Sequence, residues 1–480
     1  MNKVFRFTLI LVALTLVVSA CAAPATTPAP EPTKAPVAEE PVAEEPAPEE
    51  PVAEEPAPEE PTEEPVAEEP AAEPVNLVIW WWGEQEAPGA EAWLDETIAL
   101  YQEANPHITI DAVLQSTDSL IPAFQSAIAA QEGPDIQYFW GGVWTLEFVW
   151  EGGVAPVDDL IPAEELAHYI NNFERTYDGQ IWGVPWYMSG NPFVYNPALF
   201  EQAGIDKLPE TWDELKDACA KLNDIGVVPI SGGLKDGWFG GWLYSILSRQ
   251  THDSEKEYME ASIGNASFTD PDFAEYWARL AELRDAGCWN EDINSLDYQQ
   301  GMDRFVEGDA AMIFGNDTFL AGWADAMGGW DNIGLMMVPK YADDTMADQY
   351  VATAQGLGIT SWSPYKNQAA HFLMFMHTPD RLKSWFENTG VIPADDRMDA
   401  SVITIPQLQQ VYEWDTTVAG PNMENFIPTM LDEQAAFAGA QLLFSGDKTP
   451  EELAQMTEDV AEKWRDQDPE GVENFTIWAK

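Results

Sequence analysis

The stretch from Asp178 to Leu215 carries the densest set of local structural signals in the chain. Asp178-Gly179 is typical of a hairpin turn, and we expect a strand from Gln180 to Pro185. A polar crossing from Ser189 to Pro192, interrupted by glycine and proline, leads to a second strand at Phe193 to Asn196. This order predicts a chain that leaves one strand, crosses over, and enters another.

Helices and strands alternate on both sides of this stretch. Val75 to Trp82 is almost continuously apolar, as in the first strand of a buried parallel sheet, and Ile108 to Leu114 reads as the second strand. Helical patterns lie between and after them, at Ala92 to Asn105 and Leu120 to Gln131. Pro197 begins a further helix. The alternation predicts a doubly wound α/β fold.

A second group of signals consists of helix caps. Thr211 with Glu214 forms a capping box for a helix that ends near Ile225. Asp270 is placed to cap the helix that Pro271 opens, and Thr449 to cap a helix that runs to Trp464.

The spacing of the stretch resembles that of the extracellular solute-binding proteins of ABC importers, in the sugar-binding branch that includes maltose-binding protein. The residues that carry the resemblance are Asp178, Gly179, Gly183, Pro185, Tyr195, Asn196, Leu199, Phe200, Ala203, Gly204, Pro209, Thr211, Trp212, Asp213, Glu214 and Leu215. Further matching phrases stand at 133–136, 301–312 and 355–394. The resemblance covers roughly Val75 to Lys480.

The resemblance implies a two-lobe periplasmic-binding-protein fold, type II-like, with the ligand cleft between lobes joined by crossing strands. The first lobe would comprise 75–188 and about 357–400, and the second 189–356 and about 401–480. The function implied is the capture of an extracellular sugar or oligosaccharide and its delivery to a membrane ABC permease.

The expected ligand-binding residues lie at strand ends and in glycine-rich loops. In open α/β sheets, ligands bind beyond the carboxyl ends of the strands. Aromatic rings suit the apolar face of a sugar, and polar side chains suit its hydroxyls. The residues expected to stack are Trp82, Trp140, Trp186, Tyr187 and Trp238, and those expected to contact hydroxyls are Glu84, Asn316, Asp317 and Gln355. For each tryptophan, a place in the core is the competing interpretation.

Three details qualify this list. The family's aromatic residue after the phrase at 301–312 is missing, because Gly315-Asn316-Asp317 stands there. Trp186 and Tyr187 would face opposite ways in a regular strand, so we expect only one of them to stack. Trp238 and Phe239 are expected on a glycine-flanked loop, and Trp242 on the core face of a helix.

The N-terminal segment predicts export. Residues 1–20 resemble a secretory signal, and Val18-Ser19-Ala20-Cys21 resembles a lipobox, which implies lipidation at Cys21 and anchoring to the bacterial cell membrane. The alternative is an ordinary signal peptide with an incidental cysteine. Residues 22–74 hold 15 Pro and 16 Glu and predict a disordered linker, so the acylated Cys21 and the linker together span 21–74.

The charge narrows the range of partners. Of the net charge of −61, the signal segment contributes +2 and the Pro/Glu tract −15, which leaves −48 for residues 75 to 480. Nucleic acid is excluded, because its phosphates require Lys and Arg. Anionic ligands are disfavoured. The alternative function is that of a receptor for a cationic solute, a polyamine or a quaternary ammonium compound. We expect a monomer.

No catalytic, cofactor or metal-binding signature is present in the sequence. The motifs H-E-x-x-H, G-x-S-x-G and G-x-x-x-x-G-K-[ST] are absent, and the five histidines are scattered. We therefore expect no enzyme, no cofactor and no metal. An extracellular glycoside hydrolase is the remaining catalytic alternative. Cys219 and Cys288 are either paired in a disulfide or two buried thiols.

Overall fold

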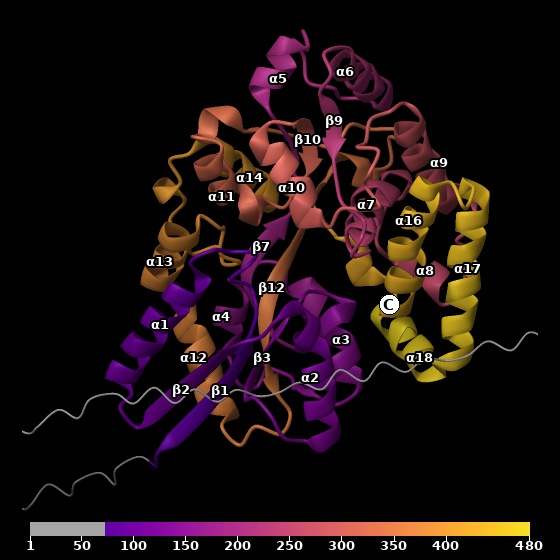
Figure 1. The fold of residues 1–480 in the computed structure, drawn as a ribbon. Helices are drawn as coiled ribbons and strands as arrows, with labels where there is room; N and C mark the ends of the chain where they lie inside the picture. The colour runs from indigo at the N-terminus through magenta and orange to yellow at the C-terminus, as the bar shows by residue number, and fades with distance from the viewer. Residues whose placement is uncertain (1–72) are drawn as a thin grey trace, which may run out of the picture. The chain divides into compact units, whose positions relative to one another are not determined.

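The computed structural model describes residues 73–480, so the signal segment, the lipobox and residues 22–72 of the linker lie outside the described residues. Two larger sheets organise this part of the chain (Figure 1). In the first, the strand order is β13-β12-β3-β1-β2, and β4 and β7 also pair with β12. Its strands are β1 (Val75–Trp81), β2 (Ile108–Leu114), β3 (Ile136–Phe139), β4 (Val154–Ala155), β7 (Val184–Gly190), β12 (Tyr350–Thr360) and β13 (Ala419–Gly420).

The N-terminal strands follow the sequence pattern. β1 pairs in parallel with both β2 and β3, and Leu77, Ile79 and Trp81 are buried along it. The expected first and second strands are therefore confirmed, although β1 ends one residue earlier, at Trp81. Because these strands are parallel, their carboxyl ends meet at one edge of the sheet, and β12 runs antiparallel to β3 beside them.

The second sheet has the order β11-β8-β10-β9. β10 runs parallel to β9 and antiparallel to β8. The strands are β8 (Phe193–Tyr195), β9 (Val228–Ser231), β10 (Ala310–Phe314) and β11 (Gly334–Met336). The chain thus enters this sheet after β7 and leaves it for β12, so β7 and β12 are the strands that connect the two sheets (Figure 1).

The expected bounds of the first crossing are wrong. The strand predicted from Gln180 to Pro185 is divided into β6 (Gln180–Ile181) and β7, and β7 continues through the predicted crossing as far as Gly190. The cause is tertiary, because the end of β7 pairs with the start of β12, with Gly190 opposite Ala352. The predicted turn is confirmed. Asp178 and Gly179, with φ of 48° and 74°, join β5 (Thr176–Tyr177) to β6 in the left-handed conformation that two-residue hairpins require.

Helices cover both sheets. In the first half of the chain they are α1 (Ala90–Ala104), α2 (Thr117–Ala130), α3 (Val143–Trp150), α4 (Ala163–Leu166), α5 (Pro197–Gln202), α6 (Trp212–Asp224), α7 (Phe239–Leu247), α8 (Lys256–Ser262) and α9 (Pro271–Asp285). In the second half they are α10 (Tyr298–Glu307), α11 (Leu320–Ala326), α12 (Lys366–Met376), α13 (Pro379–Thr389), α14 (Pro406–Thr417), α15 (Thr429–Leu431), α16 (Ala438–Ser445), α17 (Pro450–Gln467) and α18 (Pro469–Trp478).

Shorter 3-10 turns fill the gaps between these elements, at η1 (Asn172–Arg175), η2 (Ser248–Thr251), η3 (Asp317–Phe319), η4 (Trp330–Asn332), η5 (Thr345–Asp348), η6 (Ala400–Val402) and η7 (Met423–Phe426). A π-helical segment, η8, covers Asp432–Phe437. Among residues 73–480, no helix combines the length and the apolar character needed to cross a membrane.

Two of the three predicted helix caps are confirmed, and the third is not. Thr211 forms the predicted capping box, and Thr449, predicted as a cap, also forms a complete capping box, with Glu452. Asp270 occupies the N-cap of α9, but its carboxylate accepts the Ser267 N–H at 3.1 Å and makes no bond to the helix. Of the two alternatives for the cysteines, the structure contains the disulfide, which joins Cys219 in α6 to Cys288 with a Cα–Cα distance of 5.2 Å.

The hydrophobic core has two main parts. One surrounds the first sheet and includes Ile79, Tyr138 and Phe372, all fully buried. The other surrounds the second sheet and extends into the C-terminal helices through Leu443, Leu453 and Phe475. A third, smaller cluster forms between α2, α3 and the first sheet.

Candidate ligand-binding site

The short segment η7 is hydrogen-bonded both to a helix that packs on the second sheet and to a strand of the first sheet. The Glu424 N–H donates to Ser245 Oγ in α7 at 2.8 Å, and Asn425 Nδ2 donates to Thr353 Oγ1 in β12 at 3.0 Å. Asn425 also packs directly on Gly142 at the start of α3. Figure 1 shows α7 above α3, on the same side of β12. The region around η7 is therefore a meeting point of both sheets and of the C-terminal segment.

One group of half-buried tryptophans lies at the carboxyl ends of β1 and β3. The ring centroid of Trp140 is 5.5 Å from that of Trp82 and 6.1 Å from that of Trp144. The structure brings the predicted residues Trp82 and Trp140 together and adds Trp144 from α3. Sequence reasoning missed Trp144, although its spacing of four residues from Trp140 was a usable signal.

A second aromatic group begins α7. Trp238 and Trp242 lie 5.0 Å apart, and both pack on Tyr298, at 4.9 and 5.3 Å. Trp238 lies in the turn before α7, as the predicted loop requires, whereas Phe239 is the first residue of the helix and is buried against Tyr298, so the loop prediction is wrong for Phe239. Trp242, assigned to the core from sequence, is half-buried beside Trp238. The prediction for Phe239 failed because α7 starts at this residue, directly after Trp238.

Three of the predicted residues donate hydrogen bonds to one buried carboxylate, that of Glu86. It lies in the loop after β1 and is 5% exposed. Four side chains donate to it, at distances of 2.8 to 3.4 Å. They are Ser189 Oγ (2.8 Å), Tyr187 Oη (3.1 Å), Asn316 Nδ2 (3.2 Å) and Gln355 Nε2 (3.4 Å). Burial raises the pKa of the Glu86 carboxyl, and these hydrogen bonds oppose that shift.

Sequence reasoning selected Glu84 in this loop and missed Glu86. Glu84 accepts the backbone N–H groups of Gly89 at 3.0 Å and of Glu91 at 2.7 Å, so both of its carboxylate oxygens hold the start of α1. The signal for Glu86 was the same as for Glu84, because both carboxylates follow the same strand by a few residues.

The alternation expected for Trp186 and Tyr187 is absent. The pairing of β7 with β12 shifts register between Gln355 and Gly356, directly opposite Trp186. This bulge turns both rings toward the same core, where they lie 5.1 Å and 5.2 Å from Trp385. Trp186 is 3% exposed and Tyr187 is fully buried. Tyr187 reaches polar partners only through its hydroxyl.

The predicted residue Asp317 is also buried, beside Asn316. Its Oδ2 accepts the Tyr350 hydroxyl at 2.9 Å. Burial raises the pKa of the Asp317 carboxyl to about 7, and the hydrogen bonds from the backbone N–H of Gly190 and from Tyr350 oppose the shift. Asp317 and Asn316 are therefore tied into the region where the two sheets meet.

Several buried acceptor atoms around η7 have no hydrogen-bond partner among the residues that the structure describes. They are Asn171 Oδ1, Glu174 Oε1, Gln355 Oε1, Asn422 Oδ1, and Asp432 Oδ1 and Oδ2. Unpaired buried donors among residues 73–480 include Arg175 Nη1, Trp150 Nε1 in α3 and Arg249 Nε. Buried polar groups left unpaired cost free energy, so this cluster marks a place where a ligand is expected to supply partners.

Half of these six acceptor atoms belong to the carboxylates of Glu174 and Asp432, and the carboxylate of Glu424 lies in η7 itself. Burial raises the pKa of Glu174 to about 7, against the hydrogen bond from Thr353, and raises that of Glu424 to about 7, against the hydrogen bond from Asn422. Burial also raises the pKa of Asp432 well above its ordinary value. Within residues 73–480, no group of three or more His, Cys, Asp or Glu side chains is arranged to hold a metal ion.

Residues 83–381 match the family model of the bacterial extracellular solute-binding protein, and the chain belongs to this family. The predicted family is confirmed. Because its members are binding proteins, the expectation that the chain is not an enzyme is confirmed by the family as well.

Individual relatives are distant. The chain is 23% identical, over 305 residues, to a Brucella abortus protein named only as a binding protein. The matched region covers 63% of this chain and 72% of that protein. It is 27% identical over 227 residues to the sn-glycerol-3-phosphate-binding periplasmic protein of Salmonella paratyphi A. The matched region covers 45% of this chain and 49% of that protein.

Among solved structures, a chitin oligosaccharide binding protein superposes with a TM-score of 0.72 and 23% identity, covering 81% of this chain and 98% of that one. This likeness confirms the predicted periplasmic-binding-protein fold.

Proposed function

We propose that the protein captures a sugar or short oligosaccharide at the site around η7 and delivers it to an ABC-type membrane permease. The observation that carries the proposal is the combination of two half-buried tryptophan groups with a cluster of unpaired buried acceptors between the two sheets. Sugars present apolar C–H faces to aromatic rings and hydroxyl donors to such acceptors.

The chemistry of the unpaired atoms supports a ligand that donates hydrogen bonds. The six unpaired acceptors around η7 are three carboxylate oxygens and three amide oxygens. A phosphate ester, such as the ligand named for the Salmonella relative, would need donors and positive charge instead. A neutral polyol satisfies the acceptors without adding charge to an already acidic chain.

We further propose that the two sheets define two lobes, 75–188 with about 357–400 and 189–356 with about 401–480, which close on the ligand by a hinge motion. β7 and β12 would form the hinge. Cys21 would carry the lipid anchor, 21–74 would act as the spacer, and the mature protein would be a monomer at the outer face of the bacterial cell membrane. Chitin-type oligosaccharides are a reasonable first class of ligand to test.

The test is a calorimetric titration of the purified chain with mono- and oligosaccharides, polyols, betaine, choline and polyamines. A saccharide that binds the unaltered protein is then titrated into Trp238→Ala and Trp242→Ala. Removing a stacking ring is expected to weaken binding about 10- to 100-fold, in proportion to the apolar area lost. Trp330→Ala, in η4 and outside both tryptophan groups, is the matched control and should bind normally.

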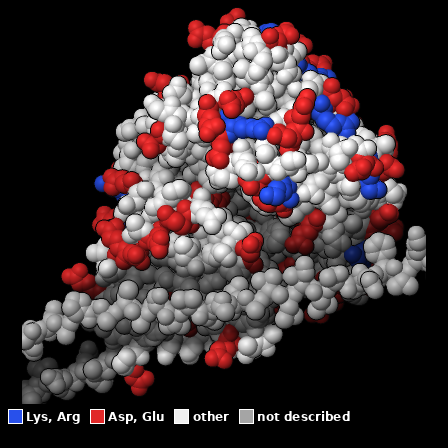
Figure 2. Space-filling view, viewed as in Figure 1, with Lys and Arg blue, Asp and Glu red and all other residues white. Residues whose placement is uncertain are grey.

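A receptor for a cationic solute remains the second candidate, because both carboxylate oxygens of Asp432 are buried without a partner among the described residues. Figure 2 shows acidic side chains spread over the face that it draws, with fewer basic ones. Salt separates the two functions. Binding of a cation should weaken steeply between low and physiological ionic strength, whereas binding of a neutral sugar should hardly change. Binding of cations alone would refute the saccharide proposal.

A further inference from the structure

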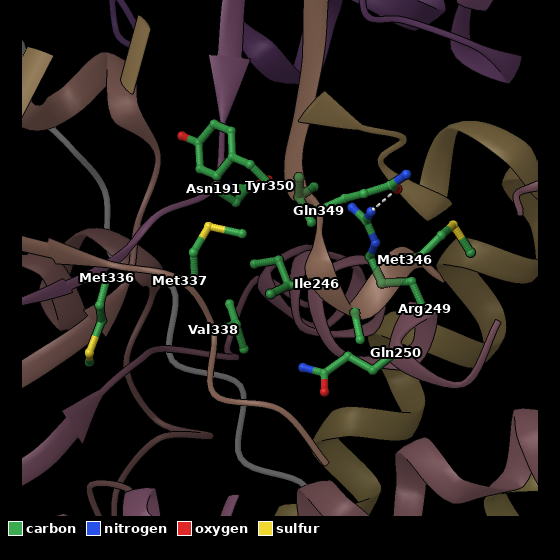
Figure 3. A pocket seen from close by; sticks show the side chains of 12 residues that line it. Asn191, Ile246, Arg249, Gln250, Met336, Met337, Val338, Met346, Gln349 and Tyr350 are labelled. Carbon is green, nitrogen blue, oxygen red and sulfur yellow. Dashed lines mark hydrogen bonds between the residues drawn. The ribbon is translucent and has the colours of Figure 1, made fainter. Parts of the chain in front are cut away.

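A small cavity lies away from the tryptophan groups, behind the start of β12. Its volume is about 20 Å³, and the side chains of Ile246, Met337, Val338, Arg249 and Tyr350 are among those that line it. Figure 3 shows Met337, Ile246 and Val338 on one side and the hydrogen bond between Arg249 and Gln349 on the other. The wall therefore combines methionine and aliphatic side chains with polar ones, Asn191, Gln250 and Gln349 among them, and with one guanidinium.

Arg249 is a buried cation without a counter-ion among the described residues. It is 1% exposed. Its Nη1 donates to the Pro421 carbonyl at 3.0 Å and its Nη2 to Gln349 Oε1 at 2.7 Å, both of which are uncharged acceptors. Its Nε is buried without a hydrogen-bond partner within residues 73–480.

Six of the other seven arginines in the described chain differ from Arg249, because each of them has a carboxylate partner. These six lie within 4.0 Å of a carboxylate oxygen, and they are Arg279, Arg284, Arg304, Arg381, Arg397 and Arg465. The seventh, Arg175, is buried next to Glu174, whose charge raises the pKa of its guanidinium against the effect of burial. Neither Arg175 nor Arg249 has a carboxylate oxygen within that distance among the described residues. Burial lowers the pKa of the Arg249 guanidinium to about 9, and the charges of Tyr258 and Glu255 oppose this shift without forming an ion pair.

A buried, unpaired charge costs several kcal/mol, so an arginine in this position is stabilised by any anion that reaches it. The cavity limits the size of that anion. A space of about 20 Å³ holds one small occupant, and the methionine and aliphatic part of its wall favours a weakly hydrated, monovalent ion over a strongly hydrated one.

We propose that this cavity binds a single halide-sized anion, such as chloride, held by the Nε–H of Arg249. The site is distinct from the sugar site and does not depend on it. Gln349 directly precedes β12 and Pro421 directly follows β13, so the guanidinium already ties together the neighbouring ends of these two strands. The anion neutralises the charge at this junction and thereby stabilises the start of β12, one of the two strands that connect the sheets.

The carboxylate of Asp317, which is bonded to Tyr350 in the cavity wall, does not replace the anion. Asp317 accepts the Tyr350 hydroxyl at 2.9 Å, and it makes no ion pair with Arg249. A single water molecule is the competing occupant, since it would also accept the Nε–H. Water and halide differ in one measurable respect, because only the halide makes stability depend on the identity of the anion.

The first measurement is the melting temperature of the full chain in sodium chloride, sodium bromide and sodium gluconate at equal ionic strength, about 150 mM. Chloride and bromide are expected to raise the melting temperature by about 2 °C relative to gluconate, through preferential binding to the folded state. Arg249→Met should abolish this difference, and Arg304→Met, which breaks a surface ion pair with Asp292, should retain it.

The second measurement does not depend on a variant that folds. Crystals of the unaltered protein grown in bromide should give an anomalous difference peak inside the cavity, within contact distance of Arg249. Equal melting temperatures in the three salts, or an empty or water-filled cavity in bromide, would overturn the proposal. Loss of sugar binding in a tryptophan variant would leave the anion result unchanged, so the two proposals fail separately.

Discussion

Asn316 Nδ2 donates to Glu86 Oε1 at 3.2 Å, and these two residues lie in loops that follow strands of different sheets. Glu86 follows β1 of the first sheet, whereas Asn316 follows β10 of the second. Asn316 also donates to Ser189 Oγ in β7 at 2.8 Å. The carboxylate of Glu86 thus connects the two sheets at the strands that would act as the hinge.

Asn316→Ala should loosen this connection. The variant removes one of four donors from a buried carboxylate and the direct side-chain bond between the two strand-end loops. We expect the ligand-free chain to shift toward an open form and to bind its ligand about 10-fold more weakly, as for loss of a hydrogen bond to a charged group. Small-angle scattering and calorimetry measure the two effects. Asn388→Ala, exposed on α13, is the control, and equal behaviour of the two variants would contradict the prediction.

Gly141→Ala should disturb the site without adding any polar group. A Cβ at Gly141 would lie 2.1 Å from Glu174 Oε2 and 2.7 Å from Thr353 Oγ1. Relief of this overlap is expected to cost about 1 to 3 kcal/mol of unfolding free energy. Gly322→Ala is the control, because it lies in α11 with nothing within 4 Å, and it should raise stability by up to about 1 kcal/mol. Denaturant titration of both variants measures the difference.

Reduction of the Cys219–Cys288 disulfide should destabilise the part of the chain around the second sheet. The two cysteines are 69 residues apart, and a cross-link of this length stabilises the folded state by about 4 kcal/mol in the chain-entropy description. Cys219→Ala with Cys288→Ala should therefore melt well below the unaltered protein under oxidising conditions. Added dithiothreitol should lower the melting temperature of the unaltered protein but not that of the double variant.

Stability should increase as the pH falls from about 7 toward 5. Burial raises the pKa of Glu147, Glu174 and Glu424 from 4.5 to about 7. Between these values the folded protein holds protons that the unfolded chain has released. The free energy of unfolding therefore decreases as pH rises through this window, by about 1 kcal/mol per pH unit for each independent group, and the loss is complete above the folded pKa.

Chemical denaturation of the ligand-free protein at several pH values measures this slope. Glu174→Gln removes one of the titrating groups and should flatten the dependence on pH. Glu132→Gln, an exposed position after α2, should leave it unchanged. A stability that increases with pH between 5 and 7 would contradict the assignment of raised pKa values to these buried carboxyls.

Much of the fold was predictable because its signals are local. The apolar run at Val75 predicts β1, Asp178-Gly179 predicts a hairpin turn, and Thr211 predicts the start of α6. Each depends on backbone preferences within a few residues. The family phrase around these positions then indicated the two-sheet arrangement. Where local reasoning failed, as at the end of β7, a pairing with β12 from a distant part of the chain decided the outcome.

The site was predictable only in part. Position at a strand end correctly predicted that the loop after β1 contributes to the site. It did not distinguish Glu84, whose carboxylate binds backbone N–H groups at the start of α1, from Glu86, whose carboxylate accepts hydrogen bonds from four side chains. Likewise, the sequence alone predicted that Trp186 and Trp238 both stack on the ligand. The structure buries Trp186 through a bulge and leaves Trp238 half-buried at the start of α7.

The sequence by itself determined the alternation of strands and helices, the turn, the caps at Thr211 and Thr449, the acidity and the family, because these follow from neighbouring residues or from overall composition. Tertiary structure alone decided which side chains share an environment. Glu86 and Asn316 are 230 positions apart, and Arg249 and Pro421 are 172 apart. Whether a buried charge at such a position finds a partner depends on how distant segments pack, and no local pattern records that packing.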